Sequence, residues 1–297
     1  MRHGIVVSGL IFLSVNLGGQ FTAVFAQEPA WVTLEQGKRE LRRGNYSEAL
    51  SAFREVREEE PSNADAARYI GRVYEENGDF RQALRYYQRA IDNAPFEIPD
   101  TLPEVHYSRA RIFERQRDYG RYENEMSRVF EYDEWYSSDE NAEQRENQLR
   151  VVRENSLSRA LVLYRLEPSV FAGPHGDYGA YLVRAGRFAE ASPHLLRSAM
   201  ETFSYALDEY RRTERDYEFT DLNSFLEEIE ESGDVRRVIE RRDGWRSTYY
   251  LATAIYFDGY STRGRELWQF MASRPEAGEW ADMAAAQLQQ PEPPSLP

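Results

Sequence analysis

Cysteine is absent from the 297-residue sequence, and its absence excludes several kinds of protein. The chain cannot form disulfides, use a thiol as a nucleophile or hold a metal through thiolates. Attachment of a lipid at a cysteine is excluded for the same reason. Lysine is almost as rare. Lys38 is the only lysine, and every other residue counted as Lys or Arg is an arginine. We interpret this arginine excess as a bias of the genome rather than as a functional feature.

The usual catalytic motifs are also missing. The sequence contains no Gly-x-Ser-x-Gly turn, no Walker phosphate loop and no dinucleotide-binding glycine motif. No His, Asp or Glu spacing resembles a metal site, and the four histidines are His3, His106, His175 and His194. The segment 173–177, Gly-Pro-His-Gly-Asp, has the composition of a turn. We therefore predict that the protein is not an enzyme and has no metal or cofactor.

Acidic residues outnumber basic ones. The sequence has 51 Asp and Glu against 37 Lys and Arg, which gives a formal net charge of −14. Such a chain is a poor general partner for nucleic acid and for anionic membrane surfaces. Its hydrophobic fraction of 41% is large enough for a packed core, so global disorder is not expected.

The N-terminus has the features of an export signal. Arg2 gives a short positive start, residues 5–17 are mostly apolar, and residues 24–26 offer a cleavage site before Gln27. The apolar run is shorter than the ~20 residues of a spanning helix, although an uncleaved anchor is the alternative. We predict a signal peptide over 1–26 and a periplasmic or secreted mature chain that is not a lipoprotein.

One spacing of small and aromatic residues occurs three times. A glycine is followed after seven residues by a second glycine, after two more by an aromatic residue, and after three more by alanine. The first two copies begin 34 residues apart, which is the period of a stacked helical repeat. Each copy predicts two antiparallel helices with a turn at the second glycine, and a cap at Asn45 or Asp79 in the first two. The copies are Gly37, Gly44, Tyr46 and Ala49; Gly71, Gly78, Phe80 and Ala83; and Gly179, Gly186, Phe188 and Ala191.

The second copy resembles a tetratricopeptide repeat. The resemblance is strong over 30–95, fair over 103–134 and 172–200, and weak elsewhere; in the third unit Arg117 replaces the turn glycine. It implies an all-α protein, a right-handed α-solenoid of antiparallel helix pairs, whose leading helices line a concave groove that binds other chains. The residues that carry the resemblance are Gly71, Tyr74, Gly78, Asp79, Phe80, Ala83, Tyr87, Ala90 and Pro95.

Composition and repeats together predict the organisation of the chain. A tetratricopeptide array follows the signal, an acidic linker or helix joins it to a degenerate helical region, and a proline-rich tail ends the chain without order. These segments are 27–134, 135–156, 157–290 and 291–297, after the signal at 1–26.

The leading helices of the array predict a basic strip. One position after each small residue, and again one turn away, the sequence has a lysine or arginine, and tyrosines lie nearby. Two interpretations stay open: a groove for an acidic peptide or a carboxylate held by arginines, or surface arginines paired with Glu75, Glu76 and Glu114. The candidate groove residues are Lys38, Arg42, Arg68, Tyr69, Arg72, Tyr107, Arg111 and Arg115.

Several aromatic residues fall outside the best repeats, and they predict either a docking patch or cover for the ends of the array. They are Trp135, Tyr136, Tyr249, Tyr250 and Tyr260.

The most direct functional interpretation is an exported scaffold or adaptor that binds another protein or an acidic peptide through a concave groove. No nucleic acid and no membrane span after signal removal are expected, and a homo-oligomer stays open. The alternatives are an accessory subunit of a periplasmic transporter or cell-envelope assembly complex, and a small-molecule or lipid carrier.

Overall fold

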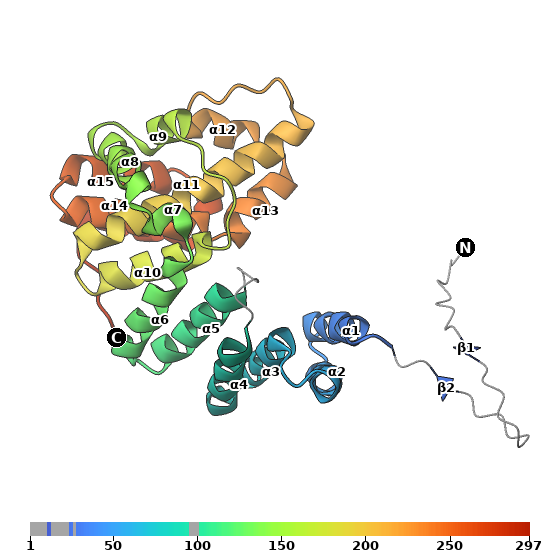
Figure 1. The fold of residues 1–297 in the computed structure, drawn as a ribbon. Helices are drawn as coiled ribbons and strands as arrows, with labels where there is room; N and C mark the ends of the chain where they lie inside the picture. The colour runs from blue at the N-terminus through green and yellow to red at the C-terminus, as the bar shows by residue number, and fades with distance from the viewer. Residues whose placement is uncertain (1–10, 13–23, 26–27, 95–100) are drawn as a thin grey trace, which may run out of the picture. The chain divides into compact units, whose positions relative to one another are not determined.

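Helices form most of the described part of the protein (Figure 1). Contacts between Cα atoms divide the chain into unit 1, Met1–Arg117, and unit 2, Asp118–Pro297. The predicted all-α class of antiparallel helix pairs is confirmed. The computed structural model describes residues 11–12, 24–25, 28–94 and 101–297.

Most of the predicted signal peptide, 1–26, lies outside the described residues. The strands β1, Ile11–Phe12, and β2, Val24–Phe25, pair antiparallel with Ile11 opposite Phe25. Among the described residues no helix has the length and apolarity that crossing a bilayer requires.

The described residues of unit 1 form two helical hairpins and a fifth helix that packs on the second hairpin. The hairpins are α1 with α2 and α3 with α4, coloured blue to blue-green in Figure 1. Their apolar stripes face inward as predicted. The buried stripe residues are Ala49, Phe53 and Val56 of α2 and Ala83, Tyr87 and Ala90 of α4. The bounds are Ala30–Arg42 for α1, Tyr46–Glu59 for α2, Ala64–Glu76 for α3, Phe80–Asn93 for α4 and Thr101–Arg115 for α5.

The turn inside the second hairpin follows from two adjacent residues. Gly78 has φ +76°, a left-handed conformation that side chains disfavour. Asp79 then caps α4, because its side chain accepts a hydrogen bond from the Gln82 backbone N–H at 3.1 Å. In the first hairpin the predicted cap is wrong: the Asn45 amide donates to Glu40 at 2.6 Å and makes no cap bond.

Close packing within the second hairpin depends on Gly71. A Cβ atom there would lie 2.7 Å from ring carbons of Tyr87, well inside contact distance. Tyr87 is almost completely buried, and its hydroxyl donates to the Glu75 carboxylate at 2.6 Å. The missing side chain of Gly71 therefore lets the Tyr87 ring lie directly on the α3 backbone.

Unit 2 is built around α11, a helix of 26 residues that packs on α10, α13 and α14. Large aromatic side chains are part of the core of unit 2, with Phe203 and Trp268 among the largest fully buried side chains. The bounds are α6 Tyr119–Glu131, α7 Glu134–Ser137, the 3-10 helix η1 Asp139–Asn141, α8 Ala142–Glu154, α9 Leu157–Leu163, α10 Ala172–Arg184, α11 Phe188–Thr213, α12 Leu222–Glu228, α13 Gly233–Arg241, α14 Gly244–Phe257, α15 Ser261–Ala272, the 3-10 helix η2 Pro275–Ala277 and α16 Glu279–Gln289.

The prediction of a turn at 173–177 is wrong, since this segment is the start of α10. Gly176 and Gly179 lie where α11 packs closely against α10, and glycine leaves room for that approach. A Cβ atom at Gly176 would meet Ser198 Oγ at 2.9 Å, and one at Gly179 would meet Leu195 Cγ at 2.5 Å. Tertiary packing thus overrides a local composition typical of turns.

The turn between α5 and α6 lacks the glycine of the other turns. Arg117 occupies that position with φ +58°, so the sequence correctly identifies it as the turn residue of the third repeat. A non-glycine residue in this conformation stores a small amount of backbone strain. The division between unit 1 and unit 2 falls at this same turn.

The segment 291–297, predicted to be a disordered tail, has no helix or strand. Its backbone is nevertheless hydrogen-bonded to the rest of unit 2. Glu292 N–H donates to Gln287 Oε1 at 2.9 Å, and Leu296 N–H donates to the Arg184 carbonyl at 3.1 Å.

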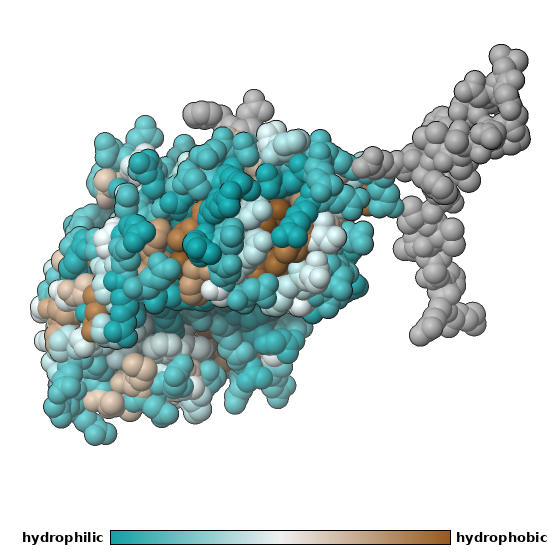
Figure 2. Space-filling view, turned by 90° about the horizontal axis from the view of Figure 1, so that it is seen from below, coloured by the Kyte–Doolittle hydropathy of each residue, from teal (hydrophilic) through white to brown (hydrophobic). Residues whose placement is uncertain are grey.

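The surface is mainly hydrophilic on the face drawn in Figure 2, where hydrophobic residues show as recessed areas between polar side chains. A few large hydrophobic side chains are exposed among the described residues. They are Trp31, Tyr132, Val162, Leu163, Val170 and Tyr260.

Candidate functional site

A pocket in unit 1 collects most of the residues predicted to form the groove. It has a volume of about 200 Å³ and is bounded by side chains of α3, α4 and α5. Its lining combines guanidinium groups, phenol rings, one carboxylate and one hydroxyl. The lining residues are Arg68, Tyr69, Arg72, Tyr87, Glu104, Tyr107, Ser108 and Arg111.

Helical spacing explains why these side chains converge. Arg68 and Arg72 are four residues apart on α3, so they project from one face of that helix. Glu104, Ser108 and Arg111 follow the same three- and four-residue steps on α5. Packing of α5 against α3 and α4 then places the two faces opposite each other.

Two of the three arginines in the pocket are already paired with carboxylates. Arg68 forms ion pairs with Glu104 and, at 3.1 Å, with Asp65. Arg111 lies 3.1 Å from the carboxylate of Glu75, whose side chain is only 4% exposed. Because a buried carboxylate needs compensation, the Glu75–Arg111 pair belongs to the packing of unit 1 as much as to any ligand site.

Arg72 differs from the other two. It is exposed, and within the described part of the chain its guanidinium has no hydrogen bond or ion pair. It therefore offers a full set of donors to an incoming anion, and a carboxylate can accept two of them side by side. Arg72 is the cation of this pocket that is available to a ligand.

Arginine guanidinium groups lie over two of the tyrosine rings of the pocket. The Tyr69 ring stacks on Phe53 with centroids 5.2 Å apart, and the Arg68 guanidinium lies 4.4 Å from its centroid. The Arg111 guanidinium lies 5.3 Å from the centroid of Tyr107. These contacts hold the arginines against flat aromatic walls, which limits the conformations that they sample.

Burial changes the acidity of one group in the wall. The pKa of Tyr87 is raised far above its ordinary value, first by burial and then by the adjacent Glu75 carboxylate. The phenol therefore stays protonated and remains a hydrogen-bond donor to Glu75.

The structure brings together five of the eight predicted groove residues and separates the other three from the pocket. Arg68, Tyr69, Arg72, Tyr107 and Arg111 line it. Lys38 remains nearby, since its ammonium group lies 5.2 Å from the Tyr69 ring, although it pairs with Glu35 at 2.7 Å. Neither Arg42 nor Arg115 lines the pocket, and Arg115 lies over the Phe80 ring at 5.8 Å.

The ion pairs of Arg68 and Arg111 agree with the interpretation of arginines paired with carboxylates, whereas the groove for an acidic ligand stays a prediction. Pairing with Glu75 was anticipated, whereas the pairing of Arg68 with Glu104 was not. The roles of Ser108 and Tyr87 in the lining were also missed. The step of three to four residues from Glu104 through Ser108 to Arg111 is the signal that could have identified that face of α5.

The extra aromatic residues lie mainly inside unit 2. Tyr249 and Tyr250 are buried, the Trp135 ring lies under the Arg197 guanidinium at 4.3 Å, and Tyr136 is hydrogen-bonded to His194. Tyr260 is 41% exposed. Their packing agrees with cover for the array rather than with a shared docking patch.

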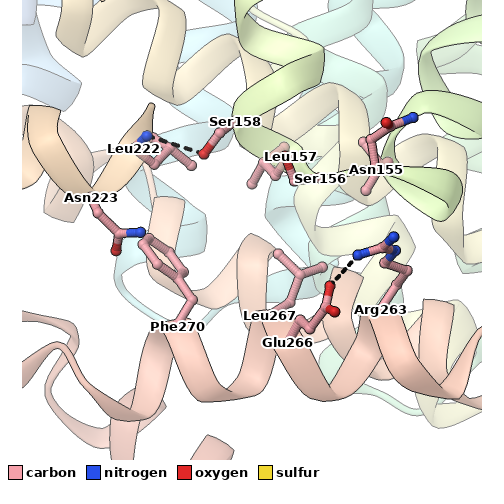
Figure 3. A pocket seen from close by; sticks show the side chains of 11 residues that line it. Asn155, Ser156, Leu157, Ser158, Leu222, Asn223, Arg263, Glu266, Leu267 and Phe270 are labelled. Atoms are coloured by element: carbon pink, nitrogen blue, oxygen red, sulfur yellow. Dashed lines mark hydrogen bonds and ion pairs between the residues drawn. The ribbon is translucent and has the colours of Figure 1, made fainter. Parts of the chain in front are cut away.

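A second, smaller pocket of about 130 Å³ lies in unit 2 (Figure 3). Leu267 and Phe270 of α15 face Leu157 and Leu222 across it. Polar groups at its rim are hydrogen-bonded to one another: Arg263 donates to the Glu266 carboxylate, and the Leu222 N–H donates to Ser158 Oγ. Like the unit 1 pocket, it is smaller than the 300–1,000 Å³ typical of small-molecule sites.

No arrangement of three or more His, Asp or Glu side chains suited to a metal ion occurs among the residues that the structure describes.

Comparison with known proteins identifies the repeats. The tetratricopeptide repeat family matches residues 34–98 and, overlapping them, 71–125. Residues 34–125 therefore contain tetratricopeptide repeats, and arrays of such repeats are in general scaffolds for protein–protein interaction.

One curated relative is an uncharacterized protein of Treponema pallidum (strain Nichols), 24% identical over 228 residues. The alignment covers 75% of this chain, and the chain spans 61% of the length of that relative.

Two solved structures align with most of this chain. YrrB, described as a TPR protein with an unusual peptide-binding site, gives a TM-score of 0.44 at 11% identity, with 89% of this chain and 93% of that chain covered. The TPR domain of P58(IPK) gives 0.31 at 13% identity, with 88% and 92% covered. Both TM-scores are below 0.5, so neither structure adds to the functional argument.

Proposed function

We propose that this protein is an exported scaffold that holds another protein by inserting an acidic residue of the partner into the unit 1 pocket. The single observation that carries the proposal is Arg72. It is an exposed guanidinium at the pocket, with no ion pair among the described residues, beside arginines that already have carboxylate partners.

The charge balance limits the ligand that the pocket prefers. Arg68 and Arg111 are compensated by Asp65, Glu104 and Glu75, so a ligand carrying many negative charges would meet these carboxylates. A segment with one acidic group at Arg72 gains an ion pair without that repulsion. The phenol rings of Tyr69 and Tyr107 favour an apolar or aromatic neighbour beside that group.

A peptide array tests this proposal. Each peptide with Asp or Glu is paired with the same peptide carrying Asn or Gln, and binding is measured with the wild-type chain. We expect the acidic member to bind more tightly, with dissociation constants in the micromolar range at best, which correspond to a binding free energy of about −8 kcal/mol. Acidic and amide peptides binding equally would contradict the proposal.

Arg72→Gln is the matched variant for the same array. Losing one charge-assisted contact should weaken acidic peptides by about tenfold or more and leave the amide peptides unchanged. Arg85→Gln on α4 is the control, because Arg85 is also exposed and the net charge changes equally. An equal loss in both variants would indicate general charge attraction instead of a site.

The exported location rests on the sequence features of residues 1–26. We expect the protein expressed in a bacterium with its signal to be recovered outside the cytoplasm with Gln27 as its first residue. N-terminal sequencing or intact mass measures this directly. A chain that stays in the cytoplasm with residues 1–26 attached would contradict the export proposal and leave the pocket proposal standing.

An accessory subunit of a transporter or envelope-assembly complex is compatible with the same pocket. Such a subunit would remain bound to its partner through gentle extraction, whereas an adaptor with micromolar affinity would dissociate on dilution.

A further inference from the structure

Four side chains of unit 2 form one continuous hydrogen-bonded series, which we name the histidine relay: Asp133, His175, His194 and Tyr136. Asp133 Oδ2 lies 3.0 Å from His175 Nε2. His175 Nδ1 lies 2.7 Å from His194 Nδ1, and His194 Nε2 lies 2.8 Å from the Tyr136 hydroxyl. Both nitrogens of both imidazole rings are therefore used.

The relay is buried and joins different parts of unit 2. His175 on α10 is 0% exposed, His194 on α11 is 5% exposed and Asp133, which precedes α7, is 3% exposed. Phe130 of α6 stacks on the His175 ring with centroids 4.5 Å apart. The relay thus fastens the α6–α7 segment to the α10–α11 hairpin through three buried polar side chains and the half-buried Tyr136.

With Asp133 ionised and both histidines neutral, one arrangement of hydrogens satisfies every contact. His175 Nε2–H donates to Asp133, His194 Nδ1–H donates to His175 Nδ1, and the Tyr136 hydroxyl donates to His194 Nε2. Burial alone would raise the pKa of Asp133, but the hydrogen bond from His175, the charges of His175 and Arg197 and the hydrogen bond from the Tyr136 backbone N–H together outweigh burial and hold that pKa below its usual range.

A single added proton reverses the direction of two hydrogen bonds, His175–His194 and His194–Tyr136, and breaks none of the three. His175 then carries hydrogens on both nitrogens and donates to Asp133 and to His194 Nδ1. His194 takes its hydrogen on Nε2 and donates to the Tyr136 oxygen. All three contacts keep one hydrogen each, and the new charge lies beside the Asp133 carboxylate.

A second added proton cannot be accommodated. Both Nδ1 atoms would then carry hydrogens that face each other across 2.7 Å, and two cations would lie side by side in a buried site. Burial lowers the pKa of His175 despite its bond to Asp133, and burial together with the charge of His175 lowers the pKa of His194 well below its ordinary value.

The charged and titratable groups around the relay do not help it to accept a second proton. The Arg197 guanidinium on α11 also opposes protonation of His175. Arg145 of α8 lies 5.5 Å from the Tyr136 ring and donates to the carbonyls of Trp135 and Ser138. Burial raises the pKa of Tyr136 to about 12, and Tyr178 of α10 and Glu190 of α11 act in the same direction, so the phenol stays protonated.

We propose that the histidine relay is a proton-operated latch. It holds the α7 segment on α10 and α11 while it carries no more than one extra proton, and it releases α7 when a second proton is taken up. The released state exposes Trp135 and Tyr136, so the surface that unit 2 presents changes on acidification.

The direction of the pH effect follows from proton linkage. Once α7 is released, the histidines bind protons near pH 6.5, whereas in the closed latch they resist protonation. The stability of the closed latch is therefore fully present above pH 6.5 and is lost as the pH falls below that value. The carboxylates of Asp and Glu in the open chain titrate mainly below pH 5, so pH 7.5 and pH 5.5 are the informative pair.

Hydrogen exchange of the full chain tests the latch. After correction for the intrinsic rate, amides of residues 133–141 should exchange about tenfold or more faster at pH 5.5 than at pH 7.5. Peptides from α3 and α4 in unit 1 serve as the internal reference and should keep their protection. Unchanged protection of residues 133–141 would overturn the proposal.

Two variants separate a titrating latch from ordinary packing. Asp133→Asn removes the carboxylate that stabilises the first proton, so its melting temperature should fall more between pH 7.5 and 5.5 than the wild-type fall of roughly 5 °C. His194→Phe keeps a ring but removes one proton acceptor, so its fall should be smaller. A His194→Phe variant that keeps the wild-type fall would contradict the proposal.

A measurement on the wild-type chain covers the case in which a variant fails to fold. Histidine ring signals in NMR report each protonation step, and the chain contains only four histidines. We expect the His175 and His194 signals to change together with those of α7. Protonation of both rings with α7 undisturbed would overturn the proposal.

Discussion

Single residues decide how closely the helices of unit 1 approach. Gly71 has the Tyr87 ring against its backbone, and Gly37 has the Phe53 ring in the same relation one hairpin earlier. These rings are buried and cannot move aside without breaking other contacts, since Tyr87 is bonded to Glu75. The glycine of each leading helix is therefore a packing requirement, although glycine weakens an isolated helix.

Gly71→Ala should destabilise unit 1 by about 1–3 kcal/mol, because the new methyl group would overlap the Tyr87 ring. Denaturant unfolding followed by circular dichroism measures the change. Gly120→Ala on α6 is the control: a Cβ atom there meets nothing within 4 Å, and alanine favours helix by up to about 1 kcal/mol. Equal effects of the two substitutions would contradict the packing argument.

Of the arginines predicted from spacing, Arg68, Arg72 and Arg111 line the pocket, and the spacing does not give all of their partners. Glu75 lies four residues after Gly71 and therefore on the inward face of α3, so its burial could have been inferred, whereas Glu76 is exposed. The partner Glu104 could not be assigned in this way, because its distance from Arg68 depends on how α5 packs against α3. Local periodicity gives the face of one helix and not the register between two helices.

Helices and turns follow the repeat where its residues are intact and depart from it where tertiary contacts dominate. The hairpins of unit 1 and the α10–α11 hairpin with its turn at Gly186 were predicted from spacing. The helical state of 173–177 was not, because glycine and proline normally mark turns. The polar contacts of His175 with Asp133 and His194 were missed for a related reason: they join three separate segments of unit 2.

The turn at Arg117 offers a direct test of how much strain one element stores. Arg117→Gly should stabilise the protein by about 0.5–1 kcal/mol, because glycine adopts φ +58° without a steric penalty but has more freedom in the unfolded chain. Calorimetry would show the gain as a higher unfolding temperature. Arg117→Ala should give no gain, since alanine meets the same penalty. A loss of stability with glycine would show that the arginine side chain makes a stabilising contact.

The whole molecule combines two units with different chemistry. Unit 1 carries the basic and aromatic pocket, and unit 2 carries the histidine relay and a core built around α11. The proposed functions are independent: acidification should release α7 in unit 2 without removing Arg72 from unit 1. Peptide affinity at pH 7.5 and at pH 5.5 should therefore depend on the acid group of the peptide alone, and isothermal titration at both values would measure this.

The most direct test of the central claim is a double-mutant cycle between Arg72 and the acidic residue of a bound peptide. Dissociation constants are measured for the wild-type chain and Arg72→Gln, each with the acidic peptide and with its amide counterpart. We predict a coupling free energy of about 1–3 kcal/mol, because only the wild-type chain with the acidic peptide contains both charges of the pair. A coupling free energy of zero would contradict the claim that Arg72 receives the acidic group of the partner.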